Sequence, residues 1–516
     1  MSKIVNLKTC AKTLVMLSVI AAPVAQAVAQ ANKVPAEVIA RRLANKKAKQ
    51  QTPSVAAKKA KAAGVQLYGY VLSSEERAPG LYKFSSNNAA SISLVNSNVQ
   101  CYNAATYVQG TYLSSWYEET DTQVKFPIHF YEYDTSTWQM KIDKPSPELA
   151  YSAISMDLAF DPETQQVYGL FSDDDYSGQY KTLGKLVTTY WGENDYTSNS
   201  VAIGELPESM VAITCNRNGD LYTIGRSGKL YAVNKYSGTA TVVGETGYKP
   251  FKLFQSATCD YSTGKIYWAM LDQYDWATRI IEIDPATGKG TEVCNFIDNY
   301  AYDQITGLYI KQDLTLKAVP QTVSNLSVDL TSLTSGMVMF NMPSKDVKDA
   351  ALSGSLNYTV RLNGEVAATG TAAAGAAVNT NFTTTVSGMT NVTVTAEIAA
   401  SGNTPAAVSA PVSQSVRLGY DQPKKPTGLK AAANGQNVTL TWKAPTGGVN
   451  GGFFDADKLT YTVVRVNSSD ATDVITLAEG ITETTYTDKI ASPDLATYYY
   501  KVAASNGDMQ LSLIHI

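Results

Sequence analysis

The chain has 516 residues, 44% of them hydrophobic and 17% charged, so it is long enough for about three domains and too apolar to be disordered throughout. Its formal net charge of −4 argues against nucleic acid as the main partner. It has only two histidines, His129 and His515, which excludes a histidine-rich metal site and means that a Ser-His-Asp triad would have to use His129.

A secretory signal peptide is predicted at residues 1–29. Three lysines precede an apolar run at residues 13–24, and small-residue cleavage sites follow the run. The run is too short for a membrane span, and no later stretch reaches the roughly eighteen apolar residues that a span needs. We therefore expect no integral membrane segment in the mature chain and a location that is secreted, extracellular or at the cell surface.

A basic linker is predicted at residues 30–64. Eight of the 42 basic residues fall between Arg41 and Lys61, with no acidic residue among them. Such a segment is either a solvated linker or an electrostatic tether to an anionic cell surface, and we favour the linker.

A repeat fills residues 65–316. A tyrosine inside a short apolar run recurs at spacings of 44, 56, 54 and 45 residues, and a second apolar run follows most of them. Turn signals such as DPATG at residues 284–288 close several units. Short strands and turns that alternate at this period are typical of four-stranded β-propeller blades. The repeating tyrosines are Tyr68, Tyr112, Tyr168, Tyr222 and Tyr267.

One predicted strand, at residues 305–310, is left over after these units, whereas the first unit starts directly at its second strand, residues 65–72. We expect the leftover strand to complete the first unit and cover its open edge, which gives five blades. Six is the alternative, if Tyr309 begins a further unit. The units resemble secreted bacterial propellers of the type YD-x-x-TGKIYW…EIDPATGKG, over residues 65–312. These motifs are structural and occur in proteins of many functions.

The loops between the second and third strands of propeller blades emerge on one face of the ring. Here those loops are acidic in four units, and three of the four are also aromatic. Aromatic rings stack on sugar faces and carboxylates accept hydrogen bonds from hydroxyls, so the predicted ligand is an extracellular glycan or surface protein. The candidate ligand-binding residues are Trp116, Tyr117, Glu118, Asp173, Asp174, Asp175, Tyr176, Tyr274, Asp275 and Trp276.

Two other interpretations of the loops stay open. Acidic residues commonly keep the loops of secreted proteins soluble, and then the loops bind nothing. Carboxylate oxygens also suit Ca²⁺, although Asp173–Asp175 lack the spaced D-x-D-x-D-G pattern of a calcium loop. Calcium is the one possible cofactor, and no other is predicted.

Four cysteines remain after removal of the signal peptide, and none forms a CxxC pair. They fit up to two disulfides in an oxidising compartment or small buried thiols inside strands. The four are Cys101, Cys215, Cys259 and Cys294.

Two β-sandwich domains are predicted at residues 318–418 and 424–510, with a linker between them. Phe340 in the first segment matches Trp442 in the second, 102 residues later. A period near 100 residues with alternating strands is typical of Ig-like sandwiches. The GGFF-containing segment at residues 445–455 is expected to be a flexible loop.

The second sandwich resembles a fibronectin type III domain. Trp442 lies where that family keeps its core tryptophan, before an APxxG turn, and L-x-x-Y-x-Y-x-V from Leu495 to Val502 resembles its sixth strand with the tyrosine corner. The first sandwich is divergent, because it has Phe340 and lacks the tyrosine.

The C-terminal residues 511–516, LSLIHI, resemble translated sequencing-adapter read-through rather than the final strand of such a domain. We therefore expect a non-native tail, an incomplete last sandwich with an open edge, and a native chain that continues.

These features predict a non-catalytic binding or adhesion protein that resembles secreted bacterial surface proteins, with a β-propeller followed by fibronectin type III-like modules. An accessory part of a larger protein, whose functional C-terminal domain is missing, is one alternative.

A propeller hydrolase, either a glycosidase or a Ca-dependent esterase or lactonase, is the other alternative. Asp157, Asp260 and Asp303 lie on or beside first strands, which line propeller channels. However, Asp161, Asp260 and Asp284 also fit turn or capping roles, which we favour, so the chain is more readily a binding protein than an enzyme.

Overall fold

The computed structural model describes residues 64–74, 77–101, 104–117, 128–145, 155–171, 182–186, 200–251, 255–274, 278–296, 303–491, 497–506 and 509–515. The predicted signal peptide and all of the predicted basic linker except residue 64 lie outside these residues. The described part is all-β, and none of it forms an α-helix or any helix that could cross a bilayer.

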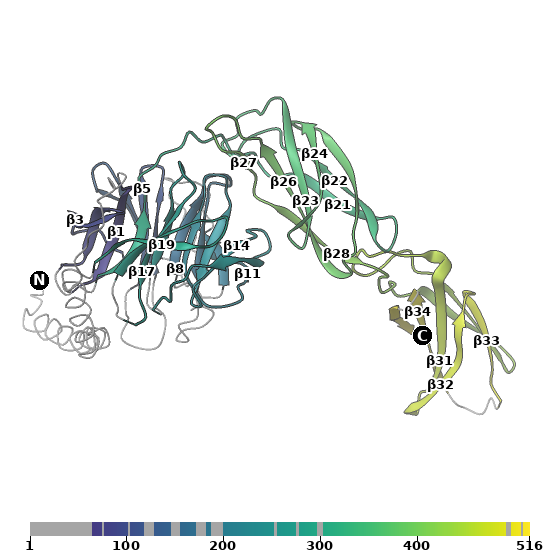
Figure 1. The fold of residues 1–516 in the computed structure, drawn as a ribbon. Coiled ribbons are helices and arrows are strands. Elements are labelled where there is room, and N and C mark those ends of the chain that lie inside the picture. Colours follow the sequence, from purple (N-terminus) through teal and green to yellow (C-terminus); the bar gives the residue numbers. More distant parts are fainter. Residues whose placement is uncertain are drawn as a thin grey trace, which may run out of the picture. The chain divides into compact units, whose positions relative to one another are not determined.

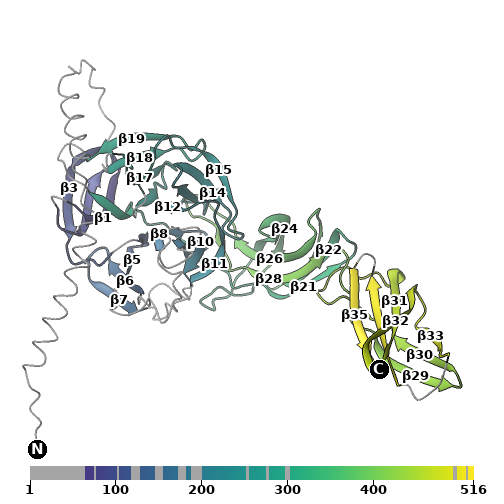
Figure 2. The same cartoon turned by 90° about the horizontal axis from the view of Figure 1, so that it is seen from below.

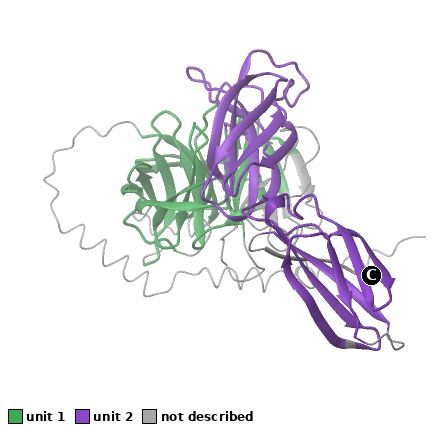
Figure 3. Ribbon diagram, turned by 90° about the vertical axis from the view of Figure 1, so that its right-hand side faces the viewer, with its two compact units in different colours: residues 1–161, 166–233, 238–313 green, residues 162–165, 234–237, 314–516 purple. Residues whose placement is uncertain are grey.

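The chain divides into two compact units (Figure 3). Unit 1 comprises residues 1–161, 166–233 and 238–313, and unit 2 comprises residues 162–165, 234–237 and 314–516.

The described residues of unit 1 form five four-stranded antiparallel sheets (Figure 1). Four of them each use four consecutive strands, β4 to β7, β8 to β11, β12 to β15 and β16 to β19, whereas the first has the order β20-β1-β2-β3. The strands are β1 (Gln66–Ser73), β2 (Gly80–Ser85), β3 (Asn88–Asn96), β4 (Ala105–Val108), β5 (Thr111–Tyr117), β6 (Ile128–Asp134), β7 (Met140–Pro145), β8 (Ser155–Asp161), β9 (Gln166–Phe171), β10 (Thr182–Leu186), β11 (Ser200–Glu205), β12 (Met210–Cys215), β13 (Leu221–Gly225), β14 (Lys229–Val233), β15 (Ala240–Glu245), β16 (Ser256–Cys259), β17 (Ile266–Leu271), β18 (Thr278–Ile283), β19 (Gly290–Asn295) and β20 (Gln304–Tyr309).

The five sheets surround a common centre (Figure 2). The first strands of the sheets, β20, β4, β8, β12 and β16, contact one another in cyclic order, and no single described sheet closes on itself. The expected pairing of the leftover strand is confirmed, because β20 lies antiparallel to β1 with Tyr68 opposite Tyr309. The alternative in which Tyr309 begins a sixth unit is wrong for the same reason.

Position within each sheet explains the sequence of each strand. All six side chains of β12, MVAITC, are buried, because neighbouring sheets cover both faces of this first strand. In β15, ATVVGE, the outermost strand of the same sheet, none is fully buried. Inner strands therefore have nearly continuous runs of apolar and small residues.

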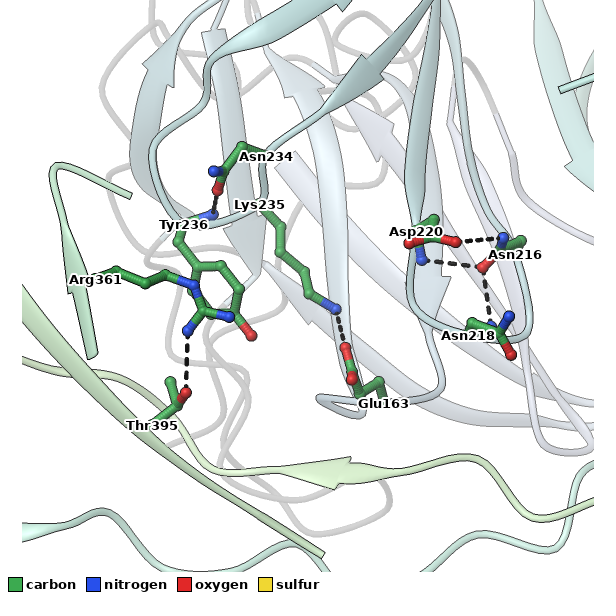
Figure 4. A network of polar contacts seen from close by, with 9 residues as sticks. All are labelled: Glu163, Asn216, Asn218, Asp220, Asn234, Lys235, Tyr236, Arg361 and Thr395. Carbon is green, nitrogen blue, oxygen red and sulfur yellow. Dashed lines mark hydrogen bonds and ion pairs between the residues drawn. The ribbon is translucent and has the colours of Figure 1, made fainter. Parts of the chain in front are cut away.

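Short turns between strands use side-chain acceptors for their backbone N–H groups. Asn216 Oδ1 accepts from the backbone nitrogens of Asn218 at 2.9 Å and Asp220 at 3.0 Å (Figure 4). Gly219 in this turn has φ +78°, which favours glycine.

Unit 2 contains two β-sandwiches with the same strand order. In the first, β21-β22-β25 faces β24-β23-β26-β27, with β28 also paired to β26; in the second, β29-β30-β33 faces β32-β31-β34-β35. The strands are β21 (Ser324–Leu330), β22 (Ser335–Asn341), β23 (Ser355–Leu362), β24 (Glu365–Ala373), β25 (Ala377–Thr383), β26 (Gly388–Ile398), β27 (Ala407–Val408), β28 (Val412–Leu418), β29 (Thr427–Asn434), β30 (Asn437–Lys443), β31 (Leu459–Asn467), β32 (Asp470–Ile481), β33 (Thr485–Lys489), β34 (Tyr498–Asn506) and β35 (Met509–His515), and the 3₁₀ turn η3 (Ala456–Lys458) precedes β31.

The match between the two sandwiches extends to ring geometry. Phe340 meets Tyr358 edge to face with centroids 5.3 Å apart and an interplanar angle of 75°. Trp442 meets Tyr461 at the same 5.3 Å and 68°. The internal match inferred from the sequence is confirmed. The expected tyrosine corner differs, because the hydroxyl of Tyr500 on β34 donates to the Asp488 carboxylate rather than to the backbone.

Two short turns, residues 162–165 and 234–237, belong to unit 2 and make charged and aromatic contacts (Figure 4). Lys235 Nζ lies 2.6 Å from Glu163 Oε2. The Arg361 guanidinium lies 3.9 Å from the centroid of the Tyr236 ring, a favourable cation–π distance.

The segment at residues 445–455, which is expected to be a flexible loop, makes hydrogen bonds to the linker. Asp421 in the linker is fully buried, and its carboxylate accepts from the backbone nitrogens of Asn450 at 2.6 Å and Gly452 at 3.0 Å. Because glycines leave the backbone N–H groups accessible, one carboxylate can hold the segment against the linker.

The expected open edge on the last sandwich is also wrong. β35 pairs antiparallel with β34 from Asn506 opposite Met509 to Lys501 opposite His515. The alternating pattern of LSLIHI is compatible with a strand whatever its origin. That residues 511–516 are non-native stays a prediction.

Candidate functional site

Most of the predicted loop residues lie outside the described residues. These are Glu118, Asp173, Asp174, Asp175, Tyr176, Asp275 and Trp276. Trp116 and Tyr117 end β5, where they pair with His129 and Ile128 of β6 through the backbone. The acidic and aromatic loop site, including its calcium alternative, therefore stays a prediction.

Tyr274 is the one predicted site residue whose side chain is described. It is 60% exposed and follows β17. Its backbone nitrogen donates to Asp272 Oδ1 at 2.8 Å, and the Asp272 carboxylate lies 3.5 Å from Arg279. The turn thus holds the tyrosine ring in solvent, where a ligand can reach it.

The centre of the ring contains a buried carboxylate, that of Asp157 on β8, which is fully buried. Its Oδ2 accepts from the backbone nitrogens of Ile213 on β12 and Ala257 on β16, both at 3.1 Å. Its Oδ1 accepts from Ser256 Oγ at 2.7 Å. Burial raises the pKa of Asp157 well above its usual value, and these hydrogen bonds oppose that rise.

The network continues from Asp157 to the remaining sheets. Ser256 Oγ accepts from the backbone nitrogen of Leu308 on β20 at 2.9 Å, and the Tyr112 hydroxyl on β5 donates to the Gly307 carbonyl at 3.3 Å. Gly307 has φ +54°, and a Cβ there would lie 2.3 Å from the Tyr112 oxygen, so the position requires glycine. A chain of polar contacts and strand pairing therefore connects all five sheets near the centre.

Asp260, the second predicted channel carboxylate, and Asp284, predicted only for a turn, have different surroundings. Asp260 accepts from Ser262 and Thr263 within its own turn, which confirms the favoured turn role. Asp284 likewise accepts from the backbone nitrogen of Ala286 at 3.1 Å.

Asp303 is buried against an arginine. Its Oδ2 lies 2.6 Å from Arg77 Nη1, and its Oδ1 has no hydrogen-bond partner in the described part of the chain. Arg77 also lines a cavity of about 340 Å³ between β3 and β19, together with Glu292, Asn295 and Phe296.

The described residues offer few groups for metal binding or thiol chemistry. No cluster of three or more His, Cys, Asp or Glu side chains that could hold a metal occurs among the described residues. The four cysteines are buried thiols rather than disulfides, which decides between the two alternatives. Burial raises the pKa of Cys101 and of Cys259 to about 12, so neither is a ready nucleophile.

Sequence reasoning identified Asp157 but not its partners. A carboxylate inside the apolar run SMDLAFD signals a buried acceptor, yet Ile213 and Ser256 lie 56 and 99 residues away. No local pattern distinguishes these donors from other residues of inner strands.

No family model matches the chain, and the curated proteins contain no match. Among solved structures, the chain is similar to a segment of two fibronectin type III domains from chicken tenascin, with 16% identity, 38% of this chain and 97% of that chain covered, and a TM-score of 0.20. It is also similar to domains FN1–FN3 of chicken CNTN1, with 12% identity, 46% and 75% covered, and a TM-score of 0.17. At these TM-scores the likeness carries no argument about this chain.

Proposed function

We propose that this protein is a secreted or cell-surface binding or adhesion protein without catalytic activity. In this proposal residues 65–316 are a five-bladed β-propeller whose acidic and aromatic loops bind a glycan or a protein. Residues 318–418 and 424–510 are fibronectin type III-like modules that space the propeller from its attachment.

The observation that carries the proposal is the use of the polar groups at the ring centre. Asp157 accepts three hydrogen bonds from three different residues of the protein itself, and Asp260 is engaged in its own turn. These carboxylates hold sheets and turns together. Tyr274, by contrast, is exposed at a turn that Asp272 fixes, which supports binding at the loop face.

The test is a glycan array probed with the chain from residue 30 onward, with and without Ca²⁺, followed by titration of the best ligand. Tyr274→Ala should weaken binding about three- to tenfold, because a stacking aromatic ring is lost. Tyr499→Ala is the matched control, since Tyr499 is 49% exposed on the second sandwich. If no ligand binds, the proposal is contradicted. If both variants lose the same amount of binding affinity, the binding site is not on the loop face.

Hydrolysis is the second candidate, and it is favoured by Asp303 Oδ1, which has no hydrogen-bond partner among the described residues. A buried carboxyl oxygen with no donor is costly unless it serves a function. Asp303→Asn should then abolish hydrolysis on a panel of glycosides, lactones and phosphoesters, whereas Asp284→Asn should not. A panel without turnover for the unmodified chain removes this candidate.

A further inference from the structure

A second cavity in unit 1 combines aromatic and cationic side chains. Its volume is about 260 Å³, and it lies between the first sheet and the turn that joins β6 to β7. Tyr68 from β1, Tyr309 from β20 and Trp138 from the turn supply rings, and Lys83 and Lys311 supply ammonium groups. No carboxylate is among its lining residues.

The rings of this cavity are held in place. Tyr68 stacks on Tyr309 with centroids 4.9 Å apart and an interplanar angle of 15°. Tyr107 also stacks on Tyr309, at 5.2 Å and 2°. Trp138 contacts Tyr112 edge to face at 6.2 Å. A ligand would meet a surface that is already ordered, which lowers the entropy cost of binding.

The backbone at Trp138 is strained. Its φ of +58° is rare for a bulky residue, and its nitrogen donates to the Asp134 carbonyl at 2.6 Å. Strain of this kind tends to occur where a side chain must be presented in one direction.

The two lysines have no ion-pair partner among the residues that the structure describes. Both are exposed. The nearby acids are engaged elsewhere: Asp134 accepts from Ser136 and lies 3.2 Å from Lys141, and the Asp313 carboxylate accepts from the Tyr107 hydroxyl at 2.6 Å. In a chain of net charge −4, this cavity is a local concentration of positive charge.

We propose that this cavity binds one acidic sugar residue, a hexuronate, of a polysaccharide. The sugar ring contacts the partly exposed rings of Tyr68 and Trp138, and its carboxylate lies between the ammonium groups of Lys83 and Lys311. The cavity is sized for one ring rather than for a larger ligand. The site is separate from the loop face of the proposed function, so either can fail while the other stands.

The test compares methyl β-D-glucuronide with methyl β-D-glucoside, which differ only in the carboxylate, by ligand-observed NMR titration on the chain from residue 30 onward. At a typical ligand efficiency the glucuronide should bind with a dissociation constant on the order of 1 mM, and the glucoside about tenfold more weakly. Inorganic phosphate, an anion without a ring, should not displace the glucuronide at equal concentration.

Exposed lysines allow substitutions that do not disturb the fold. Lys83→Gln and Lys311→Gln should each weaken glucuronide binding about three- to tenfold and leave glucoside binding unchanged. Lys289→Gln, at another exposed lysine of unit 1, should change neither. Trp138→Leu should weaken both sugars while the melting temperature shows that the fold persists.

Several outcomes would overturn the inference. They are equal binding of the two sugars, displacement of the glucuronide by phosphate, no effect of either lysine substitution, and no binding at all. Tyr274→Ala should leave glucuronide binding unchanged, which separates this site from the loop face.

Discussion

The two units handle buried polar groups in different ways. The centre of unit 1 contains Asp157 and Ser256, whereas the cores of the two sandwiches in unit 2 are formed by apolar and aromatic residues such as Phe340 and Trp442. Unit 2 also buries polar side chains, but they lie outside these hydrophobic clusters: Asp421 is in the linker, and Ser409, Asp488 and Asn506 are in or beside the sandwich strands.

Architecture explains this difference. In a ring of sheets, the first strand of each sheet has one edge without a strand partner, and its N–H groups need other acceptors. Asp157 accepts from two such groups, on β12 and β16. In a sandwich the unpaired edges lie at the sides, where water can satisfy them, so the core can be apolar.

The largest expected effect is loss of an aromatic core residue in unit 2. Trp442→Ala should lower the free energy of unfolding of its sandwich by about 3–5 kcal/mol, because it leaves a large cavity against Tyr461. Phe340→Ala should cost a similar amount in the other sandwich, where Tyr358 holds the equivalent place. Denaturant unfolding followed by circular dichroism measures both.

A conservative variant sharpens this expectation. Trp442→Phe should cost only about 1–2 kcal/mol, since the first sandwich already uses phenylalanine at this position. A Trp442→Ala variant within 1 kcal/mol of the unmodified chain would contradict the packing argument.

The next effect breaks the polar centre of unit 1. Asp157→Ala should destabilise unit 1 by about 2–4 kcal/mol, because two backbone donors and the Ser256 hydroxyl lose their acceptor inside the protein. Asp157→Asn keeps an acceptor oxygen and should cost about 1–2 kcal/mol. Calorimetry resolves which transition moves.

Two further results show whether the hydrogen bonds of Asp157 stabilise unit 1 more than those of a carboxylate in a surface turn. Asp284→Ala, in a turn, should cost less than about 1 kcal/mol. The unfolding transition of unit 2 should not shift in any of these variants. If Asp157→Ala stabilised unit 1, relief of the buried carboxylate would outweigh its hydrogen bonds, and the comparison between the units would fail.

The fold was more predictable from the sequence than the site. Strand repeats and the leftover strand at residue 305 gave the first sheet correctly, because apolar periodicity reports which faces are buried. The match of Phe340 to Trp442 correctly predicted two sandwiches with equivalent core residues, for the same reason. The hydrogen bonds between Asp421 and the segment at residues 445–455 were not predicted. Asp421 lies in the linker, and the glycines of the segment indicate only a chain with few conformational restrictions.

The cavity at Lys83 and Lys311 could not be predicted at all. Its lysines are 228 residues apart in the sequence, and they meet only because β20 pairs with β1. Trp138 gives no sign in the sequence of its left-handed backbone.

The smallest effect is a pH dependence of the stability of unit 1. Glu132 on β6 is 2% exposed, and its Oε1 has no hydrogen-bond partner among the described residues. Burial raises the pKa of Glu132 to about 7, and Lys141 on the neighbouring strand opposes that rise. Glu132→Gln removes the ionisable group while keeping its size.

The sign follows from proton binding. Between the ordinary glutamate pKa of about 4.3 and pH 7, folded unit 1 keeps a proton that the unfolded chain has lost, so its free energy of unfolding falls as pH rises, by at most about 1.4 kcal/mol per pH unit. Glu132→Gln should therefore flatten this slope and stabilise unit 1 by about 1–2 kcal/mol at pH 8, with little change at pH 4.5. Unfolding of unit 1 measured across this range checks it, and identical slopes in the variant and the unmodified chain would show that Glu132 ionises without penalty. The result tells whether unit 1 tolerates a buried charge at Glu132, away from the centre of the ring.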